Sequence, residues 1–166
     1  MIEPMLMELE QEAAATRRLL ERVPSEKLGW KPHPKSMSLG QLALHIATIP
    51  DAIAKFVQKE RLDYGEVHME QPAAESASQL LPALEDSVKS AKAILGGLDD
   101  ETAMSTWIFT KGAQTLFSAP RIGVVRTILL NHWYHHRGQL TVYLRLLGVP
   151  VPSVYGPSAD ENPFGM

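Results

Sequence analysis

The sequence predicts an all-α protein, an antiparallel four-helix bundle with a short β-hairpin or loop before the last helix. Four long segments repeat apolar residues at steps of three and four, which is the spacing of one helix face. Only one short stretch is rich in β-branched and aromatic residues. A chain of 166 residues is the usual size of one domain. We therefore expect residues 1–166 to form a single bundle domain.

The first helix is predicted over residues 4–23. Apolar residues recur along one side of this segment, and Pro24 closes it. These residues are Met5, Leu6, Leu9, Ala13, Leu20 and Val23. The loop that follows is rich in Pro and Ser, and the stretch 30–34 has too many prolines to be helical.

The second helix is predicted to start at "SLGQ", residues 38–41. In a capping box the Ser38 hydroxyl accepts from the backbone of Gln41, and the Gln41 side chain accepts from the backbone of Ser38. Steps of three and four then place His45 on the same stripe as the apolar residues of this helix. Pro50 lies inside the pattern and is expected to kink or restart the helix about one turn beyond His45.

The rest of the chain is predicted to hold two more helices and the hairpin. Residues 60–72 are polar and read as irregular, and a third helix is expected from about 74 to 95. Two short β-rich runs within residues 105–118 predict the hairpin. Pro120 then opens the longest helix, roughly 121–147. The tail after Gly148 contains large apolar residues, so we expect an ordered coil packed on the bundle.

Composition excludes several classes of protein. With no cysteine, the chain can form no disulfide, offers no thiolate ligand and has no cysteine nucleophile. A net charge of -3 and the lack of a long basic run argue against binding to nucleic acid. No segment approaches the roughly 20 apolar residues that span a bilayer, and the N-terminus resembles neither a signal peptide nor an anchor. We therefore expect a cytoplasmic protein without a membrane partner.

The stretch "NHWYHHRGQL", residues 131–140, holds three of the six histidines. His132 and His136 are four residues apart and so share a helix face, while His135 is three residues from His132 and can also face that point. Paired histidines on one helix bind zinc in many enzymes. Such a pair also arises by chance in about a third of shuffled chains of this composition, so solvated or core histidines remain the alternative.

His45, on the inner face of another predicted helix, supports the prediction of a metal site. A buried imidazole without a partner costs about 1–3 kcal/mol, so inward histidines from two helices call for a shared ligand. Three imidazoles without a fourth protein ligand would leave a coordination position open, as in catalytic zinc sites. Imidazole also suits Ni²⁺, Fe²⁺ and Co²⁺, so the ligand type does not decide the metal.

Other polar residues near the histidines allow more than one role. Gln139 and Tyr143 continue the face of the histidine pair, so they can line a pocket or hold a metal-bound water, or can simply pack within the bundle. Arg137 is rotated by roughly 100° from this face and is expected to pair with an acid or a carbonyl. His33 and His68 lie in a proline-rich loop and a polar connector, where a surface role is expected.

Three stretches resemble the DinB-like family, also called the DinB/YfiT-like metalloenzymes. They are "TRRLLERVPSEKLGWKPHPKSMSLG" at 16–40, "LGQLALHIA" at 39–47 and "NHWYHHRGQLTVYLRLLGVPVPSVYGPSADE" at 131–161. The combination is much more specific than any one piece. The resemblance implies a four-helix bundle, and the family name refers to damage-inducible proteins.

The resemblance also implies a metal site and an assembly. The family holds a divalent metal with one histidine of the second helix and an H-x-x-x-H pair of the last, which fall on His45, His132 and His136. His135 is then the additional histidine. Related proteins are thiol-dependent transferases and isomerases that use bacillithiol, mycothiol or glutathione, and they often form homodimers.

These observations predict a metal-dependent enzyme that binds a low-molecular-weight thiol and a small-molecule electrophile. A chain without cysteine fits a thiol supplied by a cosubstrate. Zn²⁺ or Ni²⁺ is the expected metal, with Fe²⁺, Co²⁺ or Mn²⁺ as alternatives. One rival is a metal-dependent hydrolase. It ranks second because no glutamate lies one turn from a ligand to act as general base, and the sequence does not show whether Asp51 or Glu161 lies near the metal. The other is a non-catalytic metal-binding or stress-response bundle.

Overall fold

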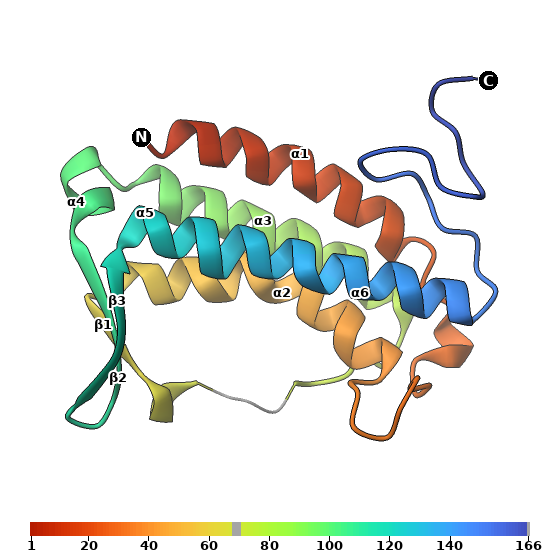
Figure 1. Cartoon of the computed structure of the whole chain (residues 1–166), viewed down its shortest axis with the longest axis horizontal. Coiled ribbons are helices and arrows are strands. Elements are labelled where there is room, and N and C mark those ends of the chain that lie inside the picture. The colour runs from red at the N-terminus through yellow and green to blue at the C-terminus, as the bar shows by residue number, and fades with distance from the viewer. Residues whose placement is uncertain (68–70, 166) are drawn as a thin grey trace.

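The computed structural model describes residues 1–67 and 71–165. Its long helices are α1 (Glu3–Leu20), α2 (Leu39–Gln58), α3 (Leu80–Gly96) and a continuous last helix made of α5 (Arg121–Val124), the π-helical segment η4 (Val125–Asn131) and α6 (His132–Leu146). Helices α1 and α2 each contact both α3 and α6 (Figure 1). Within the described residues, no helix is long and apolar enough to cross a membrane.

A small sheet lies at one end of the helices (Figure 1). Strands β2 (Thr106–Lys111) and β3 (Gln114–Pro120) form the predicted antiparallel hairpin, in which Gly112 adopts a φ of 57° at the turn. Strand β1 (Arg61–Asp63) pairs in parallel with β2 and makes the sheet three-stranded. The prediction of an irregular segment over 60–72 was therefore wrong at β1. The chain is mostly helical with a small sheet, and the expected all-α class is corrected accordingly.

The helix boundaries follow from local signals. The capping box is present at α2: Gln41 N–H donates to the Ser38 hydroxyl at 3.2 Å, and Ser38 N–H donates to Gln41 Oε1 at 2.9 Å. Helix α3 begins at Leu80, later than the predicted 74, because a 3₁₀ turn capped by Ser76 precedes it. The short helix α4 (Asp100–Met104) then leads into β2.

Helix α2 continues through Pro50 and bends near its middle (Figure 1). Proline has no N–H, so the carbonyl of Ile46, four residues earlier, has no partner within the helix. The buried indole of Trp133 donates to this carbonyl at 2.8 Å. Pro50 thus leaves the Ile46 carbonyl free to accept the hydrogen bond from Trp133 that joins α2 to α6.

The buried side chain of Arg121 fastens the sheet to the end of α2. Its guanidinium donates to the carbonyls of Val57 at 3.0 Å and Lys59 at 3.3 Å, and also to the Ser105 hydroxyl. The last carbonyls of a helix lack intrahelical donors, and a basic side chain satisfies them well. Arg121 therefore fixes the start of the last helix and the start of β2 against α2.

The tail after α6 packs on the helices, as predicted. Arg137 on α6 forms a buried ion pair with Glu12 on α1, and also donates to the Glu12 carbonyl at 3.1 Å. The hydroxyl of Tyr155 in the tail donates to Glu12 Oε2 at 2.7 Å. Arg137 thus pairs with both an acid and a carbonyl, which confirms the prediction for this residue.

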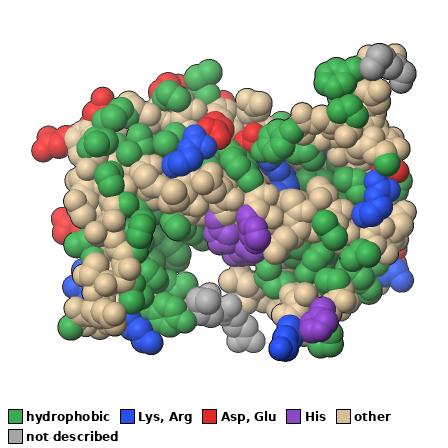
Figure 2. All heavy atoms as spheres, viewed as in Figure 1, with side chains coloured by type: hydrophobic (Ala, Val, Ile, Leu, Met, Phe, Trp, Pro, Cys, Tyr) green, Lys and Arg blue, Asp and Glu red, His purple; other side chains and the backbone are tan. Residues whose placement is uncertain are grey.

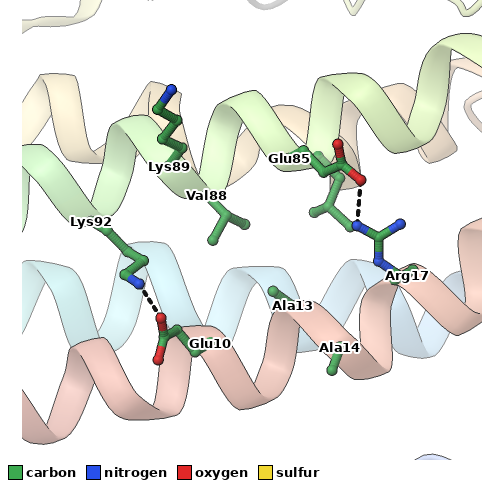
Figure 3. A pocket seen from close by; sticks show the side chains of 9 residues that line it. Glu10, Ala13, Ala14, Arg17, Glu85, Val88, Lys89 and Lys92 are labelled. Atoms are coloured by element: carbon green, nitrogen blue, oxygen red, sulfur yellow. Dashed lines mark hydrogen bonds and ion pairs between the residues drawn. The ribbon is translucent and has the colours of Figure 1, made fainter.

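A hollow of about 510 Å³ separates α1 from α3 on the surface (Figure 3). Ion pairs cross it from Arg17 to Glu85, at 2.5 Å, and from Lys92 to Glu10. Among the described residues that line it there is no histidine. This hollow is therefore separate from the histidines considered next.

Candidate metal centre

The structure brings His45, His132 and His136 together. One ring nitrogen of each lies within 4.8 Å of those of the other two, and the Nε2 atoms of His132 and His136 are 2.6 Å apart. All three side chains are partly buried. Figure 2 shows the larger group of histidines at the centre of this face, at the border of a hollow. This group could hold a metal ion.

Two local features produce this convergence. His132 and His136 are four residues apart on α6, so their rings point to one place. Ile46 and Trp133 directly follow His45 and His132 in the chain, and the hydrogen bond between them sets the register of α2 against α6. The bend at Pro50 therefore contributes to the site, because it frees the Ile46 carbonyl for that bond.

The donor set fits a divalent ion that prefers nitrogen ligands. Tetrahedral zinc, with Zn–N bonds of about 2.0–2.1 Å, holds its nitrogens about 3.4 Å apart. Here the Nε2 atoms of His132 and His136 are 2.6 Å apart and no separation within the group exceeds 4.8 Å, so the three nitrogens are close enough to share one ion.

Each histidine also has a partner outside the group. Gln139 Oε1 lies 2.7 Å from His136 Nδ1, and the Gln71 side chain and the Ile128 carbonyl act as acceptors that favour the charged form and so raise the pKa of His45 and of His132 against the effect of burial. Such bonds select the tautomer that turns the other ring nitrogen toward a metal. The histidines are therefore oriented by the protein itself.

The π-helical segment η4 ends directly before His132. A π-helix uses i to i+5 hydrogen bonds, and such segments occur frequently at functional sites. Here its Ile128 carbonyl acts on the His132 ring as an acceptor that raises the pKa of this histidine. The break in α-helical geometry thus supplies the outer partner of one histidine.

Burial is the main cause that lowers the pKa of each of the three imidazoles. Charge repulsion from His132 adds to this effect on the pKa of His45, and repulsion from His135 adds to it for His132. The pKa of His136 falls to about 4, although its bond to Gln139 opposes the shift. All three rings are therefore neutral near pH 7, which is the form that binds metals.

A cavity of about 520 Å³ lies beside the three histidines. Among the described residues of its wall, the polar ones besides the histidines are Thr48, Glu66 and Gln71. Glu66 accepts from Lys59 Nζ at 2.5 Å and from the Asp63 backbone N–H at 3.1 Å. The bond from Lys59 is the main cause that lowers the Glu66 pKa. This carboxylate is therefore ionised and already engaged.

Comparison with known proteins agrees with this fold. A sequence profile of the DinB family matches residues 2–163. The chain belongs to the DinB family. Over 153 residues this DinB-family chain is 29% identical to protein YrdA of Bacillus subtilis (strain 168), described as uncharacterized, and the match covers 92% of this chain and 86% of YrdA.

Two solved DinB-like structures share the fold of this DinB-family protein. One, from Bacillus cereus ATCC 10987, has a TM-score of 0.68 and 25% identity, covering 93% of this chain and 97% of the other. The other, YjoA of Bacillus subtilis, has a TM-score of 0.67 and 21% identity, covering 87% and 92%. The mostly helical chain with its small sheet therefore has a DinB-like fold.

The two predicted pocket residues have different positions. Gln139 contacts His136, whereas the Tyr143 hydroxyl donates to the Met37 carbonyl at 3.2 Å and its ring packs edge-on against Trp30. Tyr143 does not contribute to the wall of the cavity beside the histidines. Of the two, only Gln139 is placed to act on the site directly.

The remaining predicted polar residues lie outside the group. His135 is exposed, with its ring centre 4.9 Å from that of His136, and His33 is exposed in its loop, while His68 lies outside the described residues. Asp51 is bound to Lys55 and Ser90, and Glu161 is bound to Arg18 and the Ser153 backbone. Neither carboxylate lines the cavity.

Sequence reasoning missed Gln71, the partner of His45. Its backbone carbonyl accepts from Gln41 Nε2 at 3.0 Å, and Ala74 N–H donates to the Gly40 carbonyl at 3.2 Å. The glutamine of the capping box therefore also holds the segment that carries Gln71. No periodicity or motif in the connector marks this residue in advance.

Proposed function

We propose that this DinB-family protein is a metal-dependent enzyme in which His45, His132 and His136 bind a divalent ion, and a low-molecular-weight thiol attacks a small electrophile. The observation that carries this proposal is the convergence of three neutral imidazoles beside a cavity of about 520 Å³. Zn²⁺ or Ni²⁺ suits this ligand set best, and Fe²⁺, Co²⁺ and Mn²⁺ are alternatives.

The chain's own residues prepare the site for this chemistry. A bound divalent ion would lower the pKa of a coordinated thiol and supply a thiolate near neutral pH. The chain has no cysteine, so the thiol comes from a cosubstrate such as bacillithiol, mycothiol or glutathione. The contact from Gln139 Oε1 to His136 Nδ1 orients that imidazole, and Gln71 lines the cavity beside His45.

A hydrolase has less support. Such an enzyme often uses a free glutamate near the metal as a general base. Glu66 is the carboxylate among the described residues of the cavity wall, and it is paired with Lys59. Its lowered pKa makes it a weak base.

Metal analysis of protein purified without an affinity tag tests the ligand set. We expect about one divalent ion per chain, lost in His45→Ala, His132→Ala and His136→Ala. His135→Ala is the matched control, because this exposed histidine adjoins His136 in sequence, and it should keep the ion. Retention of the ion in all three ligand variants would overturn the site.

Thiol titration of Co²⁺-substituted protein tests the chemistry. We expect bacillithiol, mycothiol or glutathione to produce the intense near-ultraviolet absorption of a sulfur–cobalt bond. An unchanged spectrum with all three thiols would count against the thiol mechanism. If removing the ion lowers the melting temperature and none of the thiols competes for the metal, the ion is structural and the protein is a non-catalytic bundle.

We also propose a homodimer, which rests on the family resemblance. Size-exclusion chromatography with light scattering tests it, and a mass of one chain across micromolar concentrations would contradict it.

A further inference from the structure

A second cavity, of about 330 Å³, adjoins the one beside the histidines. Both cavities are lined by Ile53, Phe56, Val67 and His132, so they share a wall. The second cavity lies between the helices and the sheet, with Trp107 and Phe109 of β2 on the sheet side. A molecule in this cavity would therefore reach one of the candidate metal ligands directly.

The wall of this second cavity is hydrocarbon apart from His132. The other described residues that line it are all aromatic or aliphatic. The polar atom of Trp107 is already engaged, because its indole N–H donates to the Phe56 carbonyl at 3.0 Å. The rings of Trp107 and Phe109 lie nearly parallel, with an interplanar angle of 10°. The described residues of this cavity thus present an apolar surface without an Asp, Glu, Lys or Arg side chain to pair with a ligand.

Two apolar side chains of the wall are open to solvent. Phe117 on β3 is 41% exposed and Ile128 on η4 is 39% exposed. Their exposure shows that the hydrocarbon wall extends to the surface. A volume of about 330 Å³ lies within the roughly 300–1,000 Å³ typical of small-molecule pockets.

We propose that this apolar cavity binds the hydrophobic body of the electrophilic substrate and directs its reactive end toward His132. The inference rests on the proposed function and adds the substrate class: an uncharged small molecule with an aromatic or aliphatic body. The more polar cavity beside the histidines is left for the thiol cosubstrate. The three-stranded sheet thereby acquires a role, since β1, β2 and β3 each contribute to the apolar wall.

Naphthalene binding to metal-free protein tests the cavity independently of the metal. We expect saturable binding by calorimetry or ligand-detected NMR. Ile128→Glu should weaken it at least tenfold, because a carboxylate at this partly exposed position adds charge to the wall and can still reach water. Phe117→Lys, on a different element, should weaken it similarly. Val142→Glu is the matched control: Val142 is 56% exposed on α6 and does not line the cavity.

Straight-chain alkanethiols added to Co²⁺-substituted protein test the link to the metal. From ethanethiol to hexanethiol, we expect affinity to rise about three- to fourfold per methylene, as each enters the apolar cavity. This dependence should disappear in Ile128→Glu and persist in Val142→Glu. Equal affinity for all chain lengths, or naphthalene binding unaffected by Ile128→Glu and Phe117→Lys, would overturn the apolar site while leaving the thiol mechanism standing. Specific naphthalene binding with no thiol-induced spectrum would instead refute the thiol mechanism and support the cavity.

Discussion

At the scale of single residues, the outer partners distinguish this site from a chance cluster of histidines. His136 has Gln139 on one ring nitrogen and His132 on the other. A partner on Nδ1 restrains the orientation of the ring and leaves Nε2 facing His132, where a metal ion would bind. Gln139 lies three residues after His136 on α6, and this spacing places its side chain beside the ring.

Substitution of Gln139 by Ala should weaken metal binding by about 10–100-fold, because His136 loses the bond that selects its tautomer. Competition with a chromogenic chelator measures this affinity. Thr141→Ala, two residues further along α6, serves as the control and should bind as tightly as the wild type. An unchanged affinity in Gln139→Ala would show that the contact does not orient the imidazole.

Metal binding should also depend on pH. Imidazole must be neutral to bind a metal, so a site of three histidines with the ordinary imidazole pKa would release its ion below about pH 6. Burial lowers the pKa of all three histidines, and that of His136 to about 4, so protons compete with the metal only at lower pH. We expect the midpoint of release between about pH 6 and pH 4, measured by metal content after dialysis. Full occupancy near pH 4 would contradict a site made only of histidines.

The sequence predicted the three histidines but could not predict most of their partners. Steps of three and four placed His45 on an inner face and paired His132 with His136, since helical geometry is local. Gln71 lies in an irregular connector, and its position near His45 depends on tertiary contacts such as the bond from Gln41 Nε2 to its carbonyl. The Ile128 carbonyl is backbone, so no residue type identifies it.

At the scale of the elements, Trp133 on α6 compensates for the hydrogen-bond donor that Pro50 removes from α2. The proline removes one donor from α2, and the indole replaces it from α6. A buried carbonyl without a donor costs about 1–3 kcal/mol. The hydrogen bond from the Trp133 indole therefore contributes more to the free energy of unfolding in the presence of Pro50 than it would beside a regular helix.

A double-mutant cycle tests this coupling. Trp133→Phe should destabilise the wild type by about 1–3 kcal/mol more than it destabilises Pro50→Ala, because alanine supplies a backbone N–H to the Ile46 carbonyl. The free energy of unfolding in urea measures each corner of the cycle. Equal costs of Trp133→Phe in the two backgrounds would show that the carbonyl does not depend on the indole.

Helices were easier to predict than strands in this chain. The long amphipathic segments and the capping box are local signals, and the hairpin has β-rich runs on both sides of its turn. Strand β1 has three residues, too few to show a period of two, and it exists because β2 lies beside it. The π-helical segment escaped prediction for a similar reason: its sequence has the apolar spacing of an α-helix.

At the scale of the whole molecule, a buried ion pair joins three parts of the chain. Arg137 on α6 and Glu12 on α1 are only 3% and 7% exposed, and Tyr155 of the tail bonds to both. Removing one member of a buried pair leaves the other charged without compensation. The pair therefore fixes how α1 and the tail lie against the helix that carries His132 and His136.

Glu12→Leu should lower the free energy of unfolding by about 3–5 kcal/mol, measured in urea. The double variant Glu12→Leu/Arg137→Met should regain most of this loss, because no unpaired charge stays buried. Glu10→Leu is the control on the same helix: it removes an exposed ion pair with Lys92 and should cost less than about 1 kcal/mol. A double variant as unstable as Glu12→Leu would show that packing, and not the buried charge, causes the loss.

The order in which the chain is synthesised gives the Ile46–Trp133 contact a further consequence. Its two residues are 87 positions apart, and the candidate ligands His45 and His132 are their immediate neighbours. Contacts between such distant residues form late in folding, after most of the entropy of loop closure has been lost. A growing chain therefore cannot assemble the three-histidine group until its last helix has been made, so metal loading would follow synthesis and would then draw the folding equilibrium toward the native state.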